Sequence, residues 1–483
     1  MLLIITQVDI TSLKYVALLV ISVVIHYKLP SRFRILYLVI LSCGFIANLN
    51  VYLPLYLIFY VCINFYLGLK ISTLKWGKLF FYIGIILNLS QLLIIRYASF
   101  AIDPLLVFFG SGFKLSLISE IILPIGISYY TLQGIGYLIN VRMGWEKAEV
   151  NFLQFSLYII FFPKFLSGPI ERSNHFLKQV KDLKEFNENN ITIGLRIILI
   201  GLFKKIVIAN QLSPYVVNTF NNINSVPDDT LWLIMMIQPL YLYFDFSGYT
   251  DIAVGSAKLF GIDLLPNFNR PFFSKNMTIF WKRFHISLSS WFNDYVFRQL
   301  SFKLRRWGVL ATLTGLLITW ILFGIWHGAG WTFMLLGFLQ ALVIAYEFFT
   351  KKWRAYLFSK IPDKLGLWIG RISTYLFFSA ALTFFFAPDM TSVTAFFKKL
   401  MHLNFRIPLD GISTYPFMLI IYIPLFWIIE LLQEDYDHLY LGLVEKIRGN
   451  KKGRLLRWSL YSIILTALII EGFKNQQFIY ANF

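Results

Sequence analysis

A single histidine, His327, lies between two long apolar segments, in the stretch FGIWHGAGWTF at residues 323–333. No charged residue occurs in this stretch, and Gly324, Gly328 and Gly330 surround the ring. An ionisable group at membrane depth is costly, so it is by default a functional candidate. An imidazole can accept a proton near neutral pH, and the glycines would let the backbone or a ligand approach it closely. The alternative is a ring that only packs, with both nitrogens bonded to neighbours.

A second histidine, His285, lies in the stretch FWKRFHISLSSWFNDYVF at residues 280–297. Its neighbours recur every three or four residues, which predicts an amphipathic helix at the cytoplasmic interface with His285 in its apolar stripe. Solvation would not place a histidine there. The structural alternative is a ring that Ser287 or Ser289 satisfies. The apolar residues of this predicted stripe are Trp281, Phe284, Leu288, Trp291, Phe292 and Tyr295.

Two acidic residues form a third candidate group. The stretch PLYLYFDFSGYTDIAVG at residues 239–255 places Asp245 and Asp251, with Tyr249 between them, in an otherwise apolar and aromatic segment. Each carboxylate would be costly at membrane depth unless it is paired or faces water. The alternative to a binding role is an ion pair or a helix-end bond that holds the helices together.

Other chemistry finds little support in the chain. The remaining four histidines have no metal-site spacing, and Cys43 and Cys62 form no CxxC pair, so we expect no metal and no disulfide framework. Phosphate-binding loops and serine-nucleophile elbows are absent as motifs. The stretch GPIERS at 168–173 indicates a turn with adjacent charges at Glu171 and Arg172.

The composition indicates a membrane protein. Of 483 residues, 58% are hydrophobic and 14% are charged, whereas soluble domains average about 25% charged residues. The net charge of +19 fits cytoplasmic loops rich in Lys and Arg, and we expect no nucleic-acid partner. The apolar run near the N-terminus lacks a cleavage site and is interpreted as a retained helix.

The elements that would position these residues are helices, and the chain is predicted to be an all-α polytopic membrane protein with about 11–12 transmembrane helices. The alternation of basic loops places the N-terminus outside and three basic blocks, 171–184, 270–306 and 446–457, in the cytoplasm. Transporter-type internal repeats are not seen. The predicted helices are 13–28, 33–47, 52–69, 79–95, 117–141, 191–209, 230–247, 309–326, 331–350, 369–387, 416–433 and 457–473.

Two further segments do not read as simple spans. Residues 151–170 are apolar but have basic flanks on both sides and contain Pro163, Gly168 and Pro169, which predicts a re-entrant hairpin inside the helix assembly. Residues 263–308 are too polar to span and too aromatic for an ordinary loop, and they hold the predicted interfacial helix. We treat residues 1–483 as a single domain, with N-terminal helices at 1–115, a catalytic core at 116–350 and C-terminal helices at 351–483.

Four stretches together resemble the membrane-bound O-acyltransferase family, and within it the alginate O-acetyltransferase branch. They are LPIGISYYTLQGIGYLINV at 123–141, FFPKFLSGPIERSNHFLKQV at 161–180, the region from YFDFSGYTDIAVG through FWKRFHISLSSWFNDYVF at 243–297, and WHGAGWTFMLLG at 326–337. The ending NQQFIYANF is also similar. Two features depart from the branch: Phe284 stands where the family usually has Trp, and VFRQLSFKLRRW after Tyr295 looks more like the teichoic acid D-alanylation branch.

The resemblance implies helices around a central funnel or tunnel, with His327 and His285 at the family's two histidine positions. It also implies acyl transfer from a cytoplasmic thioester donor to a hydroxyl on the other side, in a bacterial cytoplasmic membrane. Acetyl-CoA would be the donor substrate, with no bound cofactor. A polysaccharide acceptor and an extracytoplasmic acetyltransferase or acceptor protein would be partners, besides the lipid bilayer.

We therefore predict that His327 is the general base that deprotonates the acceptor hydroxyl, and that His285 orients the donor or polarises its carbonyl. A basic cluster at Arg298, Lys303, Arg305 and Arg306 would attract the phosphates of coenzyme A, or alternatively anionic headgroups. The alternatives are D-alanyl transfer from a carrier protein to teichoic acid, and a transporter without chemistry. The predicted substrate-binding residues are Trp326, Trp281, Asn293, Asp294, Arg298, Asp245, Tyr249 and Asp251.

Overall fold

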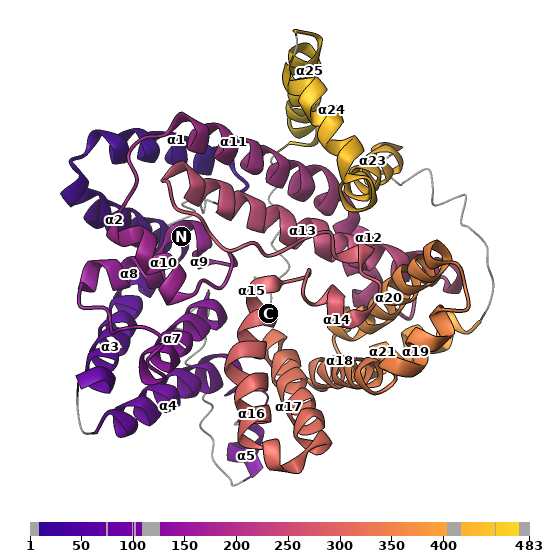
Figure 1. Ribbon diagram of the computed structural model, residues 1–483, viewed down its shortest axis with the longest axis horizontal. Helices are drawn as coiled ribbons and strands as arrows, with labels where there is room; N and C mark the ends of the chain where they lie inside the picture. Colours follow the sequence, from indigo (N-terminus) through magenta and orange to yellow (C-terminus); the bar gives the residue numbers. More distant parts are fainter. Residues whose placement is uncertain are drawn as a thin grey trace. The chain divides into compact units, whose positions relative to one another are not determined.

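The computed structural model describes residues 9–73, 76–98, 100, 103–108, 126–402, 417–449 and 451–472. Within these residues the chain is helical (Figure 1). The one β-type pairing among them is an isolated bridge between Phe268 and Phe284. A helix forms in each of the twelve predicted ranges, so the all-α prediction is confirmed. The predicted helix 117–141 begins outside the described residues, and so does the C-terminal NQQFIYANF.

Seven of the described helices are long and apolar enough to cross a membrane. This confirms a multi-pass membrane protein, although fewer helices meet the criterion than the 11–12 that we predicted. The seven helices are Ser31–Leu49, Leu53–Ser72, Gly77–Arg96, Val309–His327, Trp331–Phe349, Asp363–Phe386 and Lys451–Glu471.

The chain divides into two compact units, one formed by residues 1–200 with 249–266 and the other by residues 201–248 with 267–483.

In the first unit, α7 is buried along most of its length and packs against α3 and α4. Buried amides join these helices, since Asn88 donates to Asn64 and accepts from the hydroxyl of Tyr60 at 2.6 Å. The helices of this unit are α1 Leu13–Lys28, α2 Ser31–Leu49, α3 Leu53–Thr73, α4 Gly77–Arg96, α5 Asp103–Phe108, α7 Ile127–Arg142, α8 Phe152–Ile160, α9 Phe162–Phe165, α10 Ser173–Lys181 and most of α11 Glu188–Leu202.

The segment predicted as a re-entrant hairpin forms two short helices, α8 and α9, that meet at Phe161. At 1.5 Å per residue, the nine residues of α8 reach about 14 Å, too short for a hydrocarbon core of about 30 Å. Residues 155–165 are all buried in the protein. The segment therefore lies inside the helix assembly, as predicted. Which side of the membrane its ends face remains a prediction.

The second unit holds both candidate histidines. It contains η2 Phe203–Ala209, α12 Asn210–Asn221, η3 Asp228–Thr230, the part of α13 Leu231–Leu259 up to Gly248, η4 Pro271–Phe273, α14 Met277–Phe280, α15 Ile286–Phe292, η5 Asn293–Phe297, α16 Arg298–Lys303, η6 Arg305–Trp307, α17 Val309–His327, α18 Trp331–Phe349, α19 Lys351–Phe358, α20 Asp363–Phe386, α21 Met390–Leu400, α23 Phe417–Asp435, α24 Asp437–Gly449 and α25 Lys451–Glu471.

Helices α17 and α18 form an antiparallel hairpin joined by Gly328–Gly330 (Figure 1). Glycines allow the two backbones to approach closely: a Cβ on Gly337 would lie 2.1 Å from the Trp320 carbonyl oxygen, and one on Gly324 would lie 2.2 Å from that of Phe333. Small residues at such crossings are the usual basis of helix packing in membranes. The hairpin places His327 at its turn.

The close contact at Gly337 predicts that Gly337→Ala destabilises the hairpin by about 1–3 kcal/mol, because the methyl group must displace a backbone carbonyl. Thermal unfolding of the purified protein in detergent would show a lower midpoint. Gly44→Ala in α2 is the control, since a Cβ there meets nothing within 4 Å. Equal midpoints for the two variants would contradict the packing described here.

Candidate active site

His327 is the last residue of α17, and its side chain is buried. Its Nδ1 lies 2.8 Å from the backbone carbonyl oxygen of Phe323, one helical turn earlier. A carbonyl oxygen can only accept a hydrogen bond, so Nδ1 must carry the proton. In the neutral ring, Nε2 then holds the lone pair. The helix therefore sets which nitrogen of His327 is basic.

The close approach predicted at the glycines beside His327 is made by the protein itself at two of them, Gly324 and Gly328, so these two positions do not leave open space for a ligand. Gly324 is filled by α18, as described above. A Cβ on Gly328 would lie 2.2 Å from the ring of Phe333. These two glycines allow the helix hairpin and Phe333 to pack against the end of α17.

His285 is fully buried and has backbone angles in the left-handed region, φ 48° and ψ 50°. Its Nδ1 lies 3.2 Å from Oδ1 of Asn267, and the same oxygen accepts from the backbone N–H and the hydroxyl of Ser287. Since a backbone N–H needs an acceptor, the atom is the amide oxygen, and Nδ1 of His285 is again the donor. Burial first, and the nearby His327 second, hold the pKa of His285 well below its ordinary value, so the ring is neutral.

The predicted continuous helix from Trp281 to Tyr295 is broken at His285. Helix α14 ends at Phe280, α15 begins at Ile286, and the turn between them is held by backbone bonds from Asn269 to Arg283 and from Ile286 to Asn267. Tertiary hydrogen bonds therefore override the helical periodicity. The apolar residues of the predicted face are nevertheless all buried, including Phe284 and Leu288.

The structure brings the two imidazoles together in an aromatic box. The ring centroids of His285 and His327 lie 6.4 Å apart, and Trp326 lies 5.9 Å from the first ring and 4.9 Å from the second. Phe246 covers His285 at 4.6 Å, while Phe323 and Phe385 flank His327. These walls create a region of low dielectric, where hydrogen bonds and proton transfers are less screened than in water.

Trp281 lies beside this box. Its ring centroid is 4.9 Å from that of Phe323, the residue whose carbonyl holds His327.

Farther along the chain, Asn293 donates to Asp294, which pairs with the exposed Arg298 at 3.3 Å. These two contacts link Asn293, Asp294 and Arg298 to one another. Their contact with substrate remains a prediction.

Among the acidic candidates, Asp245 forms a buried ion pair with Lys205 of η2. This is the structural alternative weighed from the sequence, and it satisfies a carboxylate that would otherwise be costly to bury. Tyr249 and Asp251 belong to the first unit, whereas the two histidines belong to the second. A substrate-binding role for these three residues remains a prediction.

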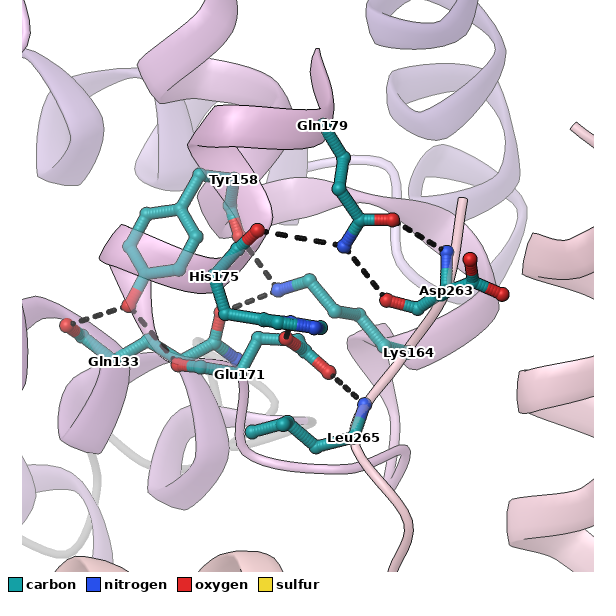
Figure 2. Close-up of polar contacts among 8 residues, drawn as sticks. All are labelled: Gln133, Tyr158, Lys164, Glu171, His175, Gln179, Asp263 and Leu265. Carbon is teal, nitrogen blue, oxygen red and sulfur yellow. Dashed lines mark hydrogen bonds and ion pairs between the residues drawn. The ribbon is translucent and has the colours of Figure 1, made fainter. Parts of the chain in front are cut away.

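A second polar cluster lies in the first unit (Figure 2). The wholly buried amine of Lys164 donates to the side chain of Gln133 and to the carbonyl of Tyr158, and the Tyr158 hydroxyl donates to the carbonyls of Gln133 and Glu171. These bonds satisfy the polar groups of the irregular backbone around α9, as burial demands. The cluster could not be predicted from a local motif, because its members are far apart along the chain.

The same cluster holds the extended segment that follows α13. The buried carboxylate of Glu171 accepts from the backbone N–H of Leu265 at 2.5 Å and from Nδ1 of His175 at 2.9 Å. The side-chain amide of Gln179 accepts from the backbone N–H of Asp263 and donates to its carbonyl, each at 2.8 Å (Figure 2). This is the pair of bonds that a residue in an adjacent β-strand would make. Asn267, the partner of His285, follows Leu265 by two residues.

Within the described ranges, no three His, Cys, Asp or Glu residues are grouped so that they could hold a metal ion. Asn267, which binds the ring of His285, is the main residue of the candidate site that no sequence motif indicated. It lies in the stretch LLPNFNRPF, which carries no chemical signal beyond polarity.

The fold and this site define an integral membrane protein with two buried imidazoles close together, each with its Nδ1 held by a hydrogen-bond acceptor. The sequence profile of the membrane-bound O-acyltransferase family matches residues 145–387, just over half of the chain, including both histidines. The chain belongs to the membrane-bound O-acyltransferase family and is an acyltransferase, which argues against the transporter alternative.

Individual relatives agree with this assignment. A peptidoglycan O-acetyltransferase of Helicobacter pylori is 32% identical over 78% of this chain and 76% of its own length. An Azotobacter vinelandii protein named a probable alginate O-acetylase is 33% identical over 67% of this chain and 65% of its own length. A teichoic acid D-alanyltransferase of Bacillus subtilis is 34% identical over 47% of this chain and 60% of its own length.

Replacing Asn267 by alanine should disturb His285 directly, because three donors lose their shared acceptor. We expect a loss of stability of about 1–3 kcal/mol and at least a tenfold fall in acyl transfer. Asn267→Asp keeps an acceptor oxygen and should retain more activity. Thermal unfolding and transfer rates check this, and wild-type rates in Asn267→Ala would contradict the role of the amide.

The pair of His175 and Glu171 should make stability depend on pH. The hydrogen bond that His175 donates to the carboxylate of Glu171 raises the pKa of His175. The stabilisation is therefore complete below the ordinary pKa of about 6.5 and is lost as pH rises through the raised value. The ring is partly exposed, so the effect should be about 1 kcal/mol or less.

The matched variant is His175→Gln, whose amide can donate to Glu171 at any pH. Thermal midpoints measured from pH 5.5 to 8.5 should show wild type more stable than this variant at low pH, with the difference shrinking as pH rises. A difference that grows with pH would contradict the assignment.

Proposed function

We propose that this protein transfers an acetyl group from a cytoplasmic thioester, acetyl-CoA, to a hydroxyl of an extracytoplasmic polysaccharide in the bacterial cytoplasmic membrane. The observation that carries the proposal is the bond from Nδ1 of His327 to the carbonyl of Phe323, which leaves Nε2 as the basic nitrogen. The relatives named for peptidoglycan and alginate acetylation support a glycan acceptor.

In the proposed mechanism, the acceptor hydroxyl attacks the thioester carbonyl while its proton passes to Nε2 of His327. The carbon–sulfur bond breaks, and the imidazolium returns the proton to the departing thiolate. Positioned proton transfer of this kind typically contributes about 10²–10⁴ in rate. The aromatic walls around the two rings protect the thioester from hydrolysis by excluding water.

His285 contributes in a different way. Its Nδ1 proton is committed to Asn267 and its pKa is lowered by burial, so Nε2 can accept a hydrogen bond but cannot donate one. Polarising a carbonyl requires a donor. An orienting role therefore fits better: Nε2 accepts a hydrogen bond from the acceptor hydroxyl or from an amide N–H of the donor.

The exposed cations of α16 and η6 support a binding role for the donor. The positive charges of Arg298, Arg305 and Arg306 would attract the phosphates of coenzyme A over a long range. Added salt would weaken this attraction by screening the charges. An extracytoplasmic acetyltransferase or acceptor protein would then receive the acetyl group on the other side of the membrane.

A second candidate is D-alanyl transfer to teichoic acid. The observation that favours it is the sequence similarity of part of this chain to two teichoic acid D-alanyltransferases, which are 34% and 31% identical to it over the aligned residues. The chemistry of the histidines would be the same, with a carrier-protein thioester as the donor. Purified protein supplied with radiolabelled acetyl-CoA separates the two: transfer or hydrolysis of the label supports acetyl transfer, and inertness supports D-alanyl transfer.

His327→Gln should lower the transfer rate at least about 10²-fold while the protein stays folded, because the ring acts on the proton and is not the main support of the helix. The assay follows labelled acetate from acetyl-CoA to peptidoglycan glycan strands. His402→Ala, at an exposed position, is the control and should keep full activity. A His327→Gln protein with normal turnover would refute the general base.

A further inference from the structure

The loop that carries His285 is attached to α18, the helix that starts just after His327. The carboxylate of Glu347 accepts from the backbone N–H of Met277 at 2.7 Å, from that of Thr278 at 2.9 Å and from the Thr278 hydroxyl at 2.6 Å. These are the first free N–H groups of α14, which a helix start leaves without partners. Glu347 therefore fixes the beginning of the segment that leads to His285.

A second bond from α18 holds the other end of α14. The indole Nε1 of Trp281 donates to Oε1 of Gln340 at 3.0 Å. The ring of Trp281 also packs against Trp320 and Phe323 of α17, each at 4.9 Å between centroids. Trp281 lies four residues before His285, and its carbonyl accepts from Ser289 in the next helix.

Gln340 and Glu347 are seven residues apart, so they lie on one face of α18, about 10 Å apart along its axis. The same helix begins at Trp331, four residues after His327. We propose that Gln340 and Glu347 are positioning residues that set the place of His285 relative to His327, and so the geometry of acyl transfer. This inference rests on the proposed function of the two histidines.

The choice of residue types supports a role beyond packing. Gln340 is 1% exposed within an apolar helix, and among the described residues its amide nitrogen has no hydrogen-bond partner. A buried amide with an unmet donor is destabilising, so an apolar residue of similar size would suit packing alone. What the amide provides instead is the bond to Trp281.

The test compares Gln340→Met and Glu347→Gln with wild type in the purified full-length protein, using labelled acetyl-CoA and glycan strands. Gln340→Met should lower kcat about tenfold, because displacements near 1 Å cost up to about 10² in rate, while KM for acetyl-CoA and the thermal midpoint change little. Glu347→Gln keeps one acceptor oxygen and should lose less activity than Glu347→Ala.

A double-mutant cycle shows whether Gln340 positions His285 through its hydrogen bond to Trp281. Trp281→Phe removes the N–H and keeps a ring, so its loss in kcat should match that of Gln340→Met, and the double variant should lose no more than either. Additive losses would overturn the proposal, because they would mean that Gln340 acts independently of Trp281.

The matched control is Asn88→Leu, which removes a buried amide from the spanning helix α4 in the first unit. It should lower the thermal midpoint without lowering kcat at temperatures well below unfolding. Normal kcat in both α18 variants, with His327→Gln inactive, would overturn this inference alone. Full activity in His327→Gln would instead refute the proposed function on which it rests.

Discussion

The hydrogen bond from the His327 ring to the carbonyl of Phe323 is the interaction on which the site depends. It ties the ring to its own helix, so the backbone of α17 decides both the direction of the imidazole and the nitrogen that is basic. A buried histidine without such a partner could adopt either tautomer. Asn267 does the same for His285 from a loop, and His285 itself has backbone angles in the left-handed region. Strain of that kind is retained where surrounding contacts determine it, often at functional sites.

Both imidazoles are supported by one helix hairpin. His327 lies at its turn, and α18 holds α14 and Trp281 through Glu347 and Gln340. The close glycine contacts between α17 and α18 keep the hairpin rigid, and the aromatic side chains around the rings lower the dielectric. The arrangement thus places two imidazoles at a fixed spacing in a region of low dielectric, as the proposed transfer from a thioester requires. The family assignment makes the chain an acyltransferase, and we propose that this spacing serves acyl transfer.

The amino-acid sequence was sufficient to predict an all-helical membrane protein and to single out the two histidines that the structure brings close together. Long apolar segments have one stable solution in a bilayer, and a lone histidine among them is conspicuous. The break at His285 was not predictable, because it depends on hydrogen bonds to Asn267, whose own stretch carries no pattern. The Lys205 partner of Asp245 lies forty residues away along the chain, and only the folded helices bring the two together. The open space expected at Gly324 and Gly328 was not found for the same reason. The residue that fills this space, Phe333, belongs to the next helix.

The most direct test of the account is the protonation state of the two rings, measured by ¹⁵N magnetic resonance on histidine-labelled protein in lipid bilayers. Difference spectra against His285→Gln and His327→Gln assign the signals. At neutral pH, both rings should be uncharged with the proton on Nδ1. A proton on Nε2 of His327, or an imidazolium at either position, would contradict the account, because the nitrogen proposed to accept the hydroxyl proton would already be occupied.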